Sequence, residues 1–327
     1  MLAYQLNTKN YANKILSLLS EIMKSPILSI CMITYNHEQF ILKAMEGILM
    51  QETDFEYEFI ISNDHSTDKT HEIIQDFLKT QPKVANIHYF HHELNLGMME
   101  NFMFALKKCQ GKYIALCEGD DYWIDTLKLQ RQVDFLEKNP EYSMCFHNSE
   151  VININGIKVE KLFCNYNTSV FYGEDLLKRW LMPTASVVYR NIEDIDFPVY
   201  FNNSTHGDLA LFLYAVQNKK IKYIDSVMSV YRLNSNSVTI NKFNGIAHNE
   251  KHIEQCKQML DYFKPKYLRL LKSRIASYLV STAFLYSENK NGKMARRRLN
   301  EALTTDFLEF LKGSKYVLRT IINVLKF

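Results

Sequence analysis

The sequence has 327 residues, 47% of them hydrophobic, and its 39 Lys and Arg residues nearly balance 36 Asp and Glu residues. A chain of this length and composition can bury one large core and a smaller satellite region, which excludes a disordered protein. The formal net charge of +3 is too small for a protein that coats nucleic acid, so we expect no nucleic-acid partner.

The cellular compartment follows from the cysteines and the apolar segments. The six cysteines lie far apart, without the close pair that supplies half a zinc site or a redox pair. We expect buried thiols in a reducing compartment. Residues 1–25 predict a helical lead-in rather than a signal peptide, and no stretch reaches the ~20 apolar residues of a membrane span. A cytoplasmic protein is expected, with peripheral contact at the cytoplasmic face of the membrane left open.

After Pro26 the sequence alternates between apolar runs and helical patterns. Residues 27–33 predict a buried strand, and 38–49 predict a helix because apolar residues recur there at helical spacing. The alternation continues with a strand at 58–61, a helix at 70–78, a strand at 87–90, a helix at 101–108 and a strand at 113–116. This order predicts an α/β fold with a mainly parallel sheet flanked by helices. Ligands of such folds bind at the carboxyl ends of the strands, where the polar turns fall.

The remainder of the chain divides into two parts. The alternation loosens after Asn139-Pro140, and we expect this half, with an apolar segment at 185–189, to be the acceptor side of one domain over 26–240. From 246 to 327 the pattern is helical, and the turn at 289–292 predicts a helical hairpin of tetratricopeptide type. One such unit is too few for a repeat array.

An acidic turn, Glu118-Gly119-Asp120-Asp121, follows the strand at 113–116. Adjacent carboxylates raise each other's pKa unless a cation lies between them. Mn²⁺ or Mg²⁺ prefers one or two carboxylates together with substrate phosphates, so the turn suits a metal that bridges diphosphate oxygens. The alternative is a solvated turn that caps the next helix through Asp125.

Two further polar turns follow predicted strands. Asp64 could accept a hydrogen bond from a base N–H or a ribose hydroxyl, although the Ser, Thr and Asp residues at 66–68 also suit a simple helix start. Tyr35, within the turn 34–38, could stack on a base, and the alternative there is an ordinary loop.

Together these blocks carry a family resemblance. The sequence resembles family 2 glycosyltransferases of the GT-A fold over residues 25–238. The resemblance rests on SICMITYNHEQFILKAMEGILMQ, FEYEFIISNDHSTDKT, HHELNLGMMENF, GKYIALCEGDDYWIDTLKLQRQVDFLE, THGDLALFLY and MSVYRLNSNSV. It implies a Rossmann-like GT-A domain with a C-terminal helical extension.

The resemblance also implies roles for individual residues. Asp208 would be the catalytic base, although it also suits the N-cap of the helix that follows. Asp121 would bind the metal, with Asp120 near it and near the ribose and diphosphate. The residues implied in donor binding are Thr34, Tyr35, Asn36, Glu38, Asp64, Asn95, Gly97, Asn101, Gly119, Asp120 and Arg232.

Two positions depart from the family pattern. His65 stands where the family often has glycine after the nucleotide aspartate, which weakens the expectation of a positive φ angle there. Asn234 stands two residues after Arg232, where the family often has histidine, and it is a poor metal ligand. Arg232 could still clamp a phosphate.

The implied reaction is inverting transfer of a hexosyl or N-acetylhexosaminyl group from a nucleotide-sugar donor, expected to be a UDP-sugar. A metal, Mn²⁺ or Mg²⁺, would stabilise the leaving diphosphate while the base removes the acceptor proton. The acceptor would be a hydroxyl of a glycan or lipid-linked molecule in cell-surface polysaccharide, lipopolysaccharide or glycoprotein synthesis. The alternatives are a sugar nucleotidyltransferase, whose glycine-rich, lysine-bearing start is absent here, and a non-catalytic nucleotide-sugar-binding or scaffold protein of the same fold.

Two features fall outside this assignment. Residues 315–327 are cationic and apolar without an acid, so this helix could lie on an anionic membrane, or pack on its own domain or a second subunit. Trp123 and Trp180 could stack on sugar, although a buried aromatic residue is more often part of the core.

Overall fold

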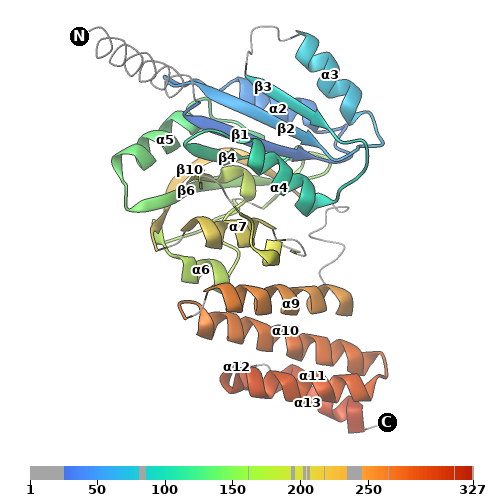
Figure 1. Ribbon diagram of the computed structural model, residues 1–327. Helices are drawn as coiled ribbons and strands as arrows, with labels where there is room; N and C mark the ends of the chain where they lie inside the picture. The colour runs from blue at the N-terminus through green and yellow to red at the C-terminus, as the bar shows by residue number, and fades with distance from the viewer. Residues whose placement is uncertain are drawn as a thin grey trace, which may run out of the picture.

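The computed structural model shows a sheet covered by helices, followed by a stack of C-terminal helices (Figure 1). It describes residues 26–80, 86–160, 162–192, 196–201, 204, 207–216, 218–233, 245–263, 265–312 and 314–325. The predicted lead-in helix at 1–25 and Asn234 lie outside these described residues.

The first half of the sheet is parallel and runs in the order β3-β2-β1-β4. Its strands are β1 (Leu28–Thr34), β2 (Tyr57–Asn63), β3 (Ile87–His91) and β4 (Tyr113–Leu116). Its helices are α2 (Ile41–Leu49), α3 (Thr70–Thr80) and α4 (Met98–Lys108). The predicted strand and helix alternation is confirmed over this half.

The second half of the sheet begins with a short antiparallel strand. β9 (Val188–Arg190) pairs antiparallel with both β4 and β6 (Tyr142–Asn153), and β10 (Lys220–Leu233) is parallel to β6. The remaining elements are β5 (Tyr122–Trp123), β7 (Lys158–Glu160), β8 (Val170–Phe171), α5 (Lys128–Lys138), α6 (Gly173–Lys178), α7 (Gly207–Val216), η1 (Thr184–Ser186) and η2 (Val199–Phe201). Because β6 and β10 run in the same direction as β1 and β4, their carboxyl ends meet at one edge of the sheet.

Two hydrophobic clusters form the core on opposite faces of the sheet. In β1, Leu28, Ile30 and Met32 join one cluster, and Cys31 joins the other. Successive side chains of a strand point to opposite faces, so a continuous apolar run fills both clusters. All six cysteines are buried as free thiols, as expected.

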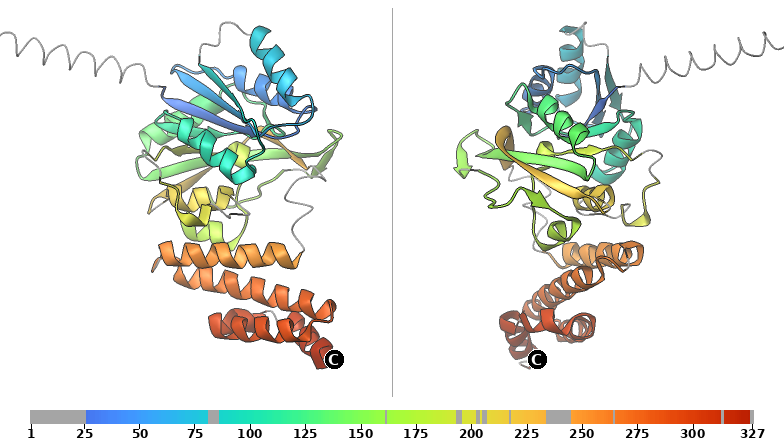
Figure 2. Two further views of the ribbon diagram at one scale, coloured as in Figure 1. Left: turned by 45° about the vertical axis from the view of Figure 1, so that its right-hand side comes forward. Right: turned by 90° about the vertical axis from the view of Figure 1, so that its left-hand side faces the viewer.

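The C-terminal helices stack away from the sheet (Figure 2). Their buried side chains join the cluster that contains Cys31. They are α9 (Ile246–Phe263), α10 (Leu268–Glu288), α11 (Gly292–Thr305), α12 (Phe307–Lys312) and α13 (Ser314–Leu325). The predicted turn at 289–292 is confirmed between α10 and α11. Of the helices described, none is long and apolar enough to cross a membrane.

Candidate active site

The loops that follow β1 and β2 are bonded to each other. The backbone N–H of Asn36 donates to Ser66 Oγ at 2.9 Å, and Asn36 Oδ1 accepts from the Thr67 N–H at 2.8 Å. The Lys69 N–H donates to Glu38 Oε2 at 3.0 Å. Asn36 and Glu38 therefore hold the rim of the predicted donor site together, with their side-chain oxygens directed into the neighbouring loop.

The turn after Asp64 keeps its left-handed conformation without glycine. His65 has φ +58°, and its Nδ1 lies 3.1 Å from the carbonyl oxygen of His92. Histidine is one of the few residue types that occupy this region with some frequency. The inference that His65 disfavours a positive φ angle in this turn was therefore wrong.

Asp64 fixes the loop that precedes α4. Its two carboxylate oxygens accept the backbone N–H groups of Leu96 at 2.7 Å and Gly97 at 3.0 Å, and Asn95 Nδ2 donates to its carbonyl oxygen at 2.9 Å. Gly97 has φ +89°, a conformation that L side chains rarely adopt. The structure thus brings Asp64, Asn95 and Gly97 together. A carboxylate has about four lone-pair sites, so hydrogen bonding to a base remains a prediction for Asp64.

Asn101 ties α4 to the end of β2. Its side chain is buried, accepts a hydrogen bond from Ser62 Oγ at 2.6 Å and donates to the Ser62 carbonyl oxygen at 3.2 Å. It therefore shapes the predicted pocket from behind. Tyr35, in contrast, is 45% exposed at the end of β1, which leaves its predicted stacking on a base open to test.

The acidic turn packs closely on the end of β1. A Cβ atom added to Gly119 would lie 2.7 Å from Thr34 Oγ1 and 2.8 Å from His37 Nδ1, so glycine permits this approach. His37 Nε2 lies 3.9 Å from Asp120 Oδ2. Thr34 and Gly119 thus position the turn, and His37 contacts its central carboxylate.

The end of β10 closes the turn from the other side. The Arg232 N–H donates to Asp121 Oδ1 at 2.8 Å, and Arg232 Nε donates to the Asp120 carbonyl oxygen at 3.0 Å. The guanidinium also lies over the Phe40 ring, 4.4 Å from its centroid. Pairing of Val230 with Tyr122 in β5 places Arg232 at this position. A phosphate contact of Arg232 remains a prediction.

The electrostatics of the turn suit a divalent cation. Burial, followed by the charge of Asp120, raises the pKa of Glu118 to about 8. Burial and the charges of Asp120 and Glu118 also raise the pKa of Asp121 well above its ordinary range. Glu118 Oε2 is buried with no hydrogen-bond partner among the described residues. A cation would relieve this repulsion, so the residues present fit one.

A metal at this turn would need further ligands from the substrate. Within the described ranges, no three His, Cys, Asp or Glu side chains form a ready-made metal site. Two carboxylates completed by diphosphate oxygens and water are the usual environment of Mg²⁺ in nucleotide sites.

Asp208 lies in the first turn of α7, beside the acidic turn. Thr184 Oγ1 donates to its Oδ2 at 3.3 Å, and the Leu209 N–H donates to its Oδ1 at 2.8 Å. Burial raises its pKa to about 6, and its charge is one of the causes that raise the pKa of Glu118. A carboxylate with a pKa near the working pH is well matched to a general base. The alternative capping role was wrong, because Asp208 lies inside α7 and an N-cap side chain accepts from the N2 or N3 N–H rather than from that of the next residue.

Sequence reasoning did not assign three residues of this site. Glu118 and His37 stood within the polar turns but received no role. Thr184 carries no local signal, because it meets Asp208 across 24 positions of the chain.

Comparison with known proteins identifies the family. The family model for Glycosyl transferase family 2 matches residues 29–190. The chain belongs to glycosyltransferase family 2. The uncharacterized protein Rv1520 of Mycobacterium tuberculosis is 34% identical to this family 2 chain over 224 residues, which are 64% of the chain and 60% of Rv1520.

A second relative has a named reaction, and a solved structure shares the fold. The UDP-Glc:alpha-D-GlcNAc-diphosphoundecaprenol beta-1,3-glucosyltransferase WfgD of Escherichia coli is 29% identical over 68% of the chain and 83% of its own length. The S. aureus TarS 1–349 structure in complex with UDP-GlcNAc superimposes with a TM-score of 0.64, at 16% identity, over 91% of this chain and 89% of that one. The expected GT-A fold is confirmed.

Proposed function

We propose that this chain is an inverting glycosyltransferase that moves a hexosyl or N-acetylhexosaminyl group from a UDP-sugar to an acceptor hydroxyl. The observation that carries the proposal is the position of Asp208. Its carboxylate, held by Thr184 and with its pKa raised to about 6, lies close enough to Glu118 to influence that residue's pKa. A base next to a turn that would hold a metal and, through it, the donor diphosphate is the arrangement that this transfer requires.

The donor would lie along the carboxyl ends of β1, β2 and β4. Tyr35 would stack on the base, and Asp64 would bind the base while it holds the loop of Asn95 and Gly97. Asn36, Glu38, Asn101, Thr34 and Gly119 would keep these loops in place. UDP as the nucleotide is supported by the donors in the names of WfgD and the TarS complex.

The diphosphate would lie over the acidic turn. Asp120 and Asp121 would hold a divalent metal, Mn²⁺ or Mg²⁺, with Glu118 adding negative charge and Arg232 contacting a phosphate. When bound, such an ion supplies Lewis-acid stabilisation of the leaving diphosphate. Gly119 lets the turn sit against Thr34, so the two carboxylates keep a fixed position relative to the donor loops.

Asp208 would remove the acceptor proton. The acceptor oxygen forms a bond to the anomeric carbon while the bond from that carbon to the diphosphate oxygen breaks, and the proton passes to Asp208 Oδ2 or Oδ1. Attack from the face opposite the diphosphate inverts the anomeric centre. The Thr184 hydroxyl stabilises the charged carboxylate between turnovers.

The acceptor would be a glycan or a lipid-linked sugar in cell-surface polysaccharide synthesis. The lipid-linked acceptor in the name of WfgD supports this class. Such an acceptor lies at a membrane, and the C-terminal helices offer a surface for peripheral contact.

That surface, here called the α12–α13 apolar surface, consists of exposed side chains on the last two helices. They are Phe307, Leu308, Leu311, Leu318, Ile321 and Ile322. On α13, Val317 and Thr320 are buried and hold the helix to its neighbours. Because residues 315–327 contain three basic residues and no acid, we assign this surface to an anionic lipid membrane at the cytoplasmic face.

Release of UDP from UDP-glucose and UDP-N-acetylglucosamine tests the activity. We expect metal-dependent release by the wild type, accelerated by an acceptor, and loss of the accelerated rate in Asp208→Asn. Donor binding without turnover under any acceptor would instead favour a scaffold protein.

A further inference from the structure

Strand β10 ends in two neighbouring side chains that lie on opposite faces of the sheet. β6 and β10 keep one register from Ser229 to Leu233, so Tyr231 and Arg232 point to opposite faces. The Arg232 guanidinium lies over Phe40, which precedes α2, and α2 packs in one of the two hydrophobic clusters. Tyr231 therefore points to the face of the other cluster.

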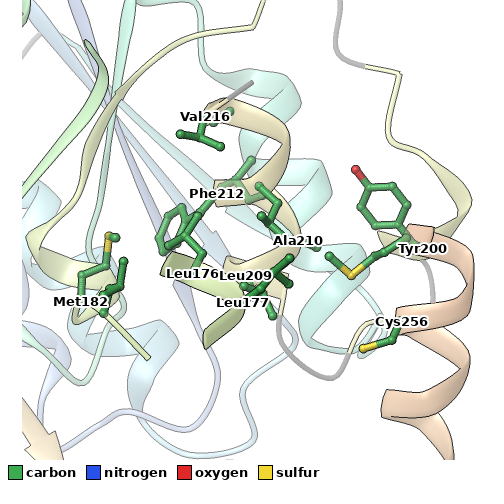
Figure 3. Close-up of a cluster of buried hydrophobic side chains, with 14 of the residues drawn as sticks. Leu176, Leu177, Met182, Tyr200, Leu209, Ala210, Phe212, Val216 and Cys256 are labelled. Carbon is green, nitrogen blue, oxygen red and sulfur yellow. The ribbon is translucent and has the colours of Figure 1, made fainter. Parts of the chain in front are cut away.

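The face that Tyr231 reaches is the one that carries the proposed base. The Tyr231 ring meets the Phe163 ring edge-to-face, with their centroids 5.2 Å apart, and Phe163 packs against the cluster that contains α7. Figure 3 shows Leu209 and Phe212 of α7 within this cluster. Asp208 lies in the first turn of the same helix, so the packing of α7 fixes its position on this face.

Tyr231 also adjoins the proposed metal site. The next N–H group of the strand, that of Arg232, donates to Asp121 Oδ1 at 2.8 Å. Burial raises the pKa of Tyr231, and the charges of all four acids of the site raise it further. These acids are Asp121, Asp120, Glu118 and Asp208. The phenol is therefore near both the acidic turn and the base, and it stays protonated at neutral pH.

The Tyr231 hydroxyl is available to a ligand. Within the part of the chain that the structure describes, no group hydrogen-bonds this hydroxyl, and the side chain is only partly buried. A protonated phenol can donate one hydrogen bond. The contact with Phe163 restricts the ring, which limits the side-chain entropy lost when the hydroxyl binds.

We propose that the Tyr231 hydroxyl faces the transferred sugar and donates a hydrogen bond to one of its hydroxyl oxygens. The inference rests on the proposed function. Inverting displacement requires the anomeric carbon to lie between the leaving diphosphate oxygen, at the acidic turn, and the acceptor oxygen, at Asp208. A side chain near both ends therefore faces the sugar between them. A site that hydrogen-bonds a substrate hydroxyl rejects analogues that lack it, so Tyr231 contributes to the choice of sugar.

Calorimetric titration separates a contact with the sugar from a contact with the nucleotide. UDP, UDP-glucose, UDP-galactose and UDP-N-acetylglucosamine are titrated with Mn²⁺ present into the wild type and Tyr231→Phe. Phenylalanine keeps the ring that contacts Phe163 and removes only the hydroxyl. We expect an unchanged Kd for UDP. The Kd of the UDP-sugar that the wild type binds most tightly should rise roughly three- to tenfold.

Tyr57→Phe is the matched control. Tyr57 is likewise partly buried, burial raises its pKa, and it begins β2, at the edge of the sheet opposite the acidic turn. This variant should bind UDP and all UDP-sugars as the wild type does. The melting temperatures of both variants are compared with that of the wild type to confirm folding.

The ratio of the Kd for the UDP-sugar to the Kd for UDP decides the outcome. The same ratio in Tyr231→Phe and the wild type would overturn the inference, even if both ligands bound more weakly, because the lost contact would not be to the sugar. If UDP binds the wild type and the ratio does not change, only the role of Tyr231 is removed. If the wild type binds no nucleotide, the proposed function fails at its donor site and this inference fails with it.

Discussion

The backbone N–H of Arg232 donates to Asp121 Oδ1 at 2.8 Å, and this bond joins the end of β10 to the acidic turn across 111 positions of the chain. Asp121 is 4% exposed. One of its oxygens therefore anchors the sheet, whatever the other one binds. Substitutions at Asp121 must be chosen to separate these two roles.

Asparagine and alanine at position 121 have different consequences. Asp121→Asn retains an oxygen that accepts the Arg232 N–H, whereas Asp121→Ala leaves that buried N–H unpaired and should cost about 1–3 kcal/mol of stability. If Asp121 also binds the metal, both variants lose metal-dependent UDP binding. Thermal unfolding and calorimetry of both proteins check this. Full metal-dependent binding by Asp121→Asn would leave Asp120 as the metal ligand and Asp121 as an anchor.

The transfer rate should depend on the protonation of Asp208. A base with its pKa raised to about 6 is active when deprotonated, so kcat/KM should fall about tenfold per pH unit below about pH 6 and level off above it. Asp208→Asn should reduce transfer by roughly 10² to 10⁴. Initial rates at fixed saturating metal check both statements. A flat profile from pH 5 to 8 would argue against Asp208 as the base.

Thr184→Val should shift the pH dependence of kcat/KM. The Thr184 hydroxyl hydrogen-bonds the charged form of Asp208 and lowers its pKa, so its removal should shift the acidic limb to higher pH. Valine has nearly the same shape, which limits packing effects. A reduced rate with an unmoved limb would indicate a purely structural contact.

Lys128→Met should stabilise the protein at neutral pH. Lys128 is fully buried, its Nζ has no hydrogen-bond partner among the described residues, and burial lowers its pKa from 10.5 to about 7. The unfolded chain then binds the proton more tightly, so wild-type stability falls as the pH drops from about 10.5 to 7 and levels off below. Methionine carries no charge and removes this loss of stability. We expect the free energy of unfolding to rise by about 2 kcal/mol at pH 7, and by less at alkaline pH. Denaturant unfolding at several pH values checks the trend, and a destabilised variant would contradict it.

The α12–α13 apolar surface should bind anionic vesicles. Leu318→Glu with Ile322→Glu places two acids on the exposed face of α13 and should reduce co-sedimentation with phosphatidylglycerol vesicles severalfold. Leu94→Glu is the matched control, because Leu94 is 74% exposed and lies far from these helices in the chain. Equal sedimentation of all variants, or binding to neutral phosphatidylcholine alone, would remove the membrane assignment.

Much of the fold could be predicted because its signals are local. The run 27–33 and the acidic turn after the strand at 113–116 are contiguous in the sequence, and both lie in the structure where they were expected. β9 was harder to predict as antiparallel, because a three-residue strand carries almost no periodicity. The roles of Asn36, Glu38 and Thr184 depend on partners 24 to 31 positions away, which no local pattern reveals.

Calorimetric titration of UDP, with GDP and CDP for comparison, tests the central claim most directly. It is performed with and without Mn²⁺ on the wild type, Asp120→Asn and Asp208→Asn. We predict metal-dependent UDP binding to the wild type and to Asp208→Asn, and its loss in Asp120→Asn. If no nucleotide binds with or without metal, or if Asp120→Asn binds UDP as the wild type does, the donor site does not lie at the acidic turn.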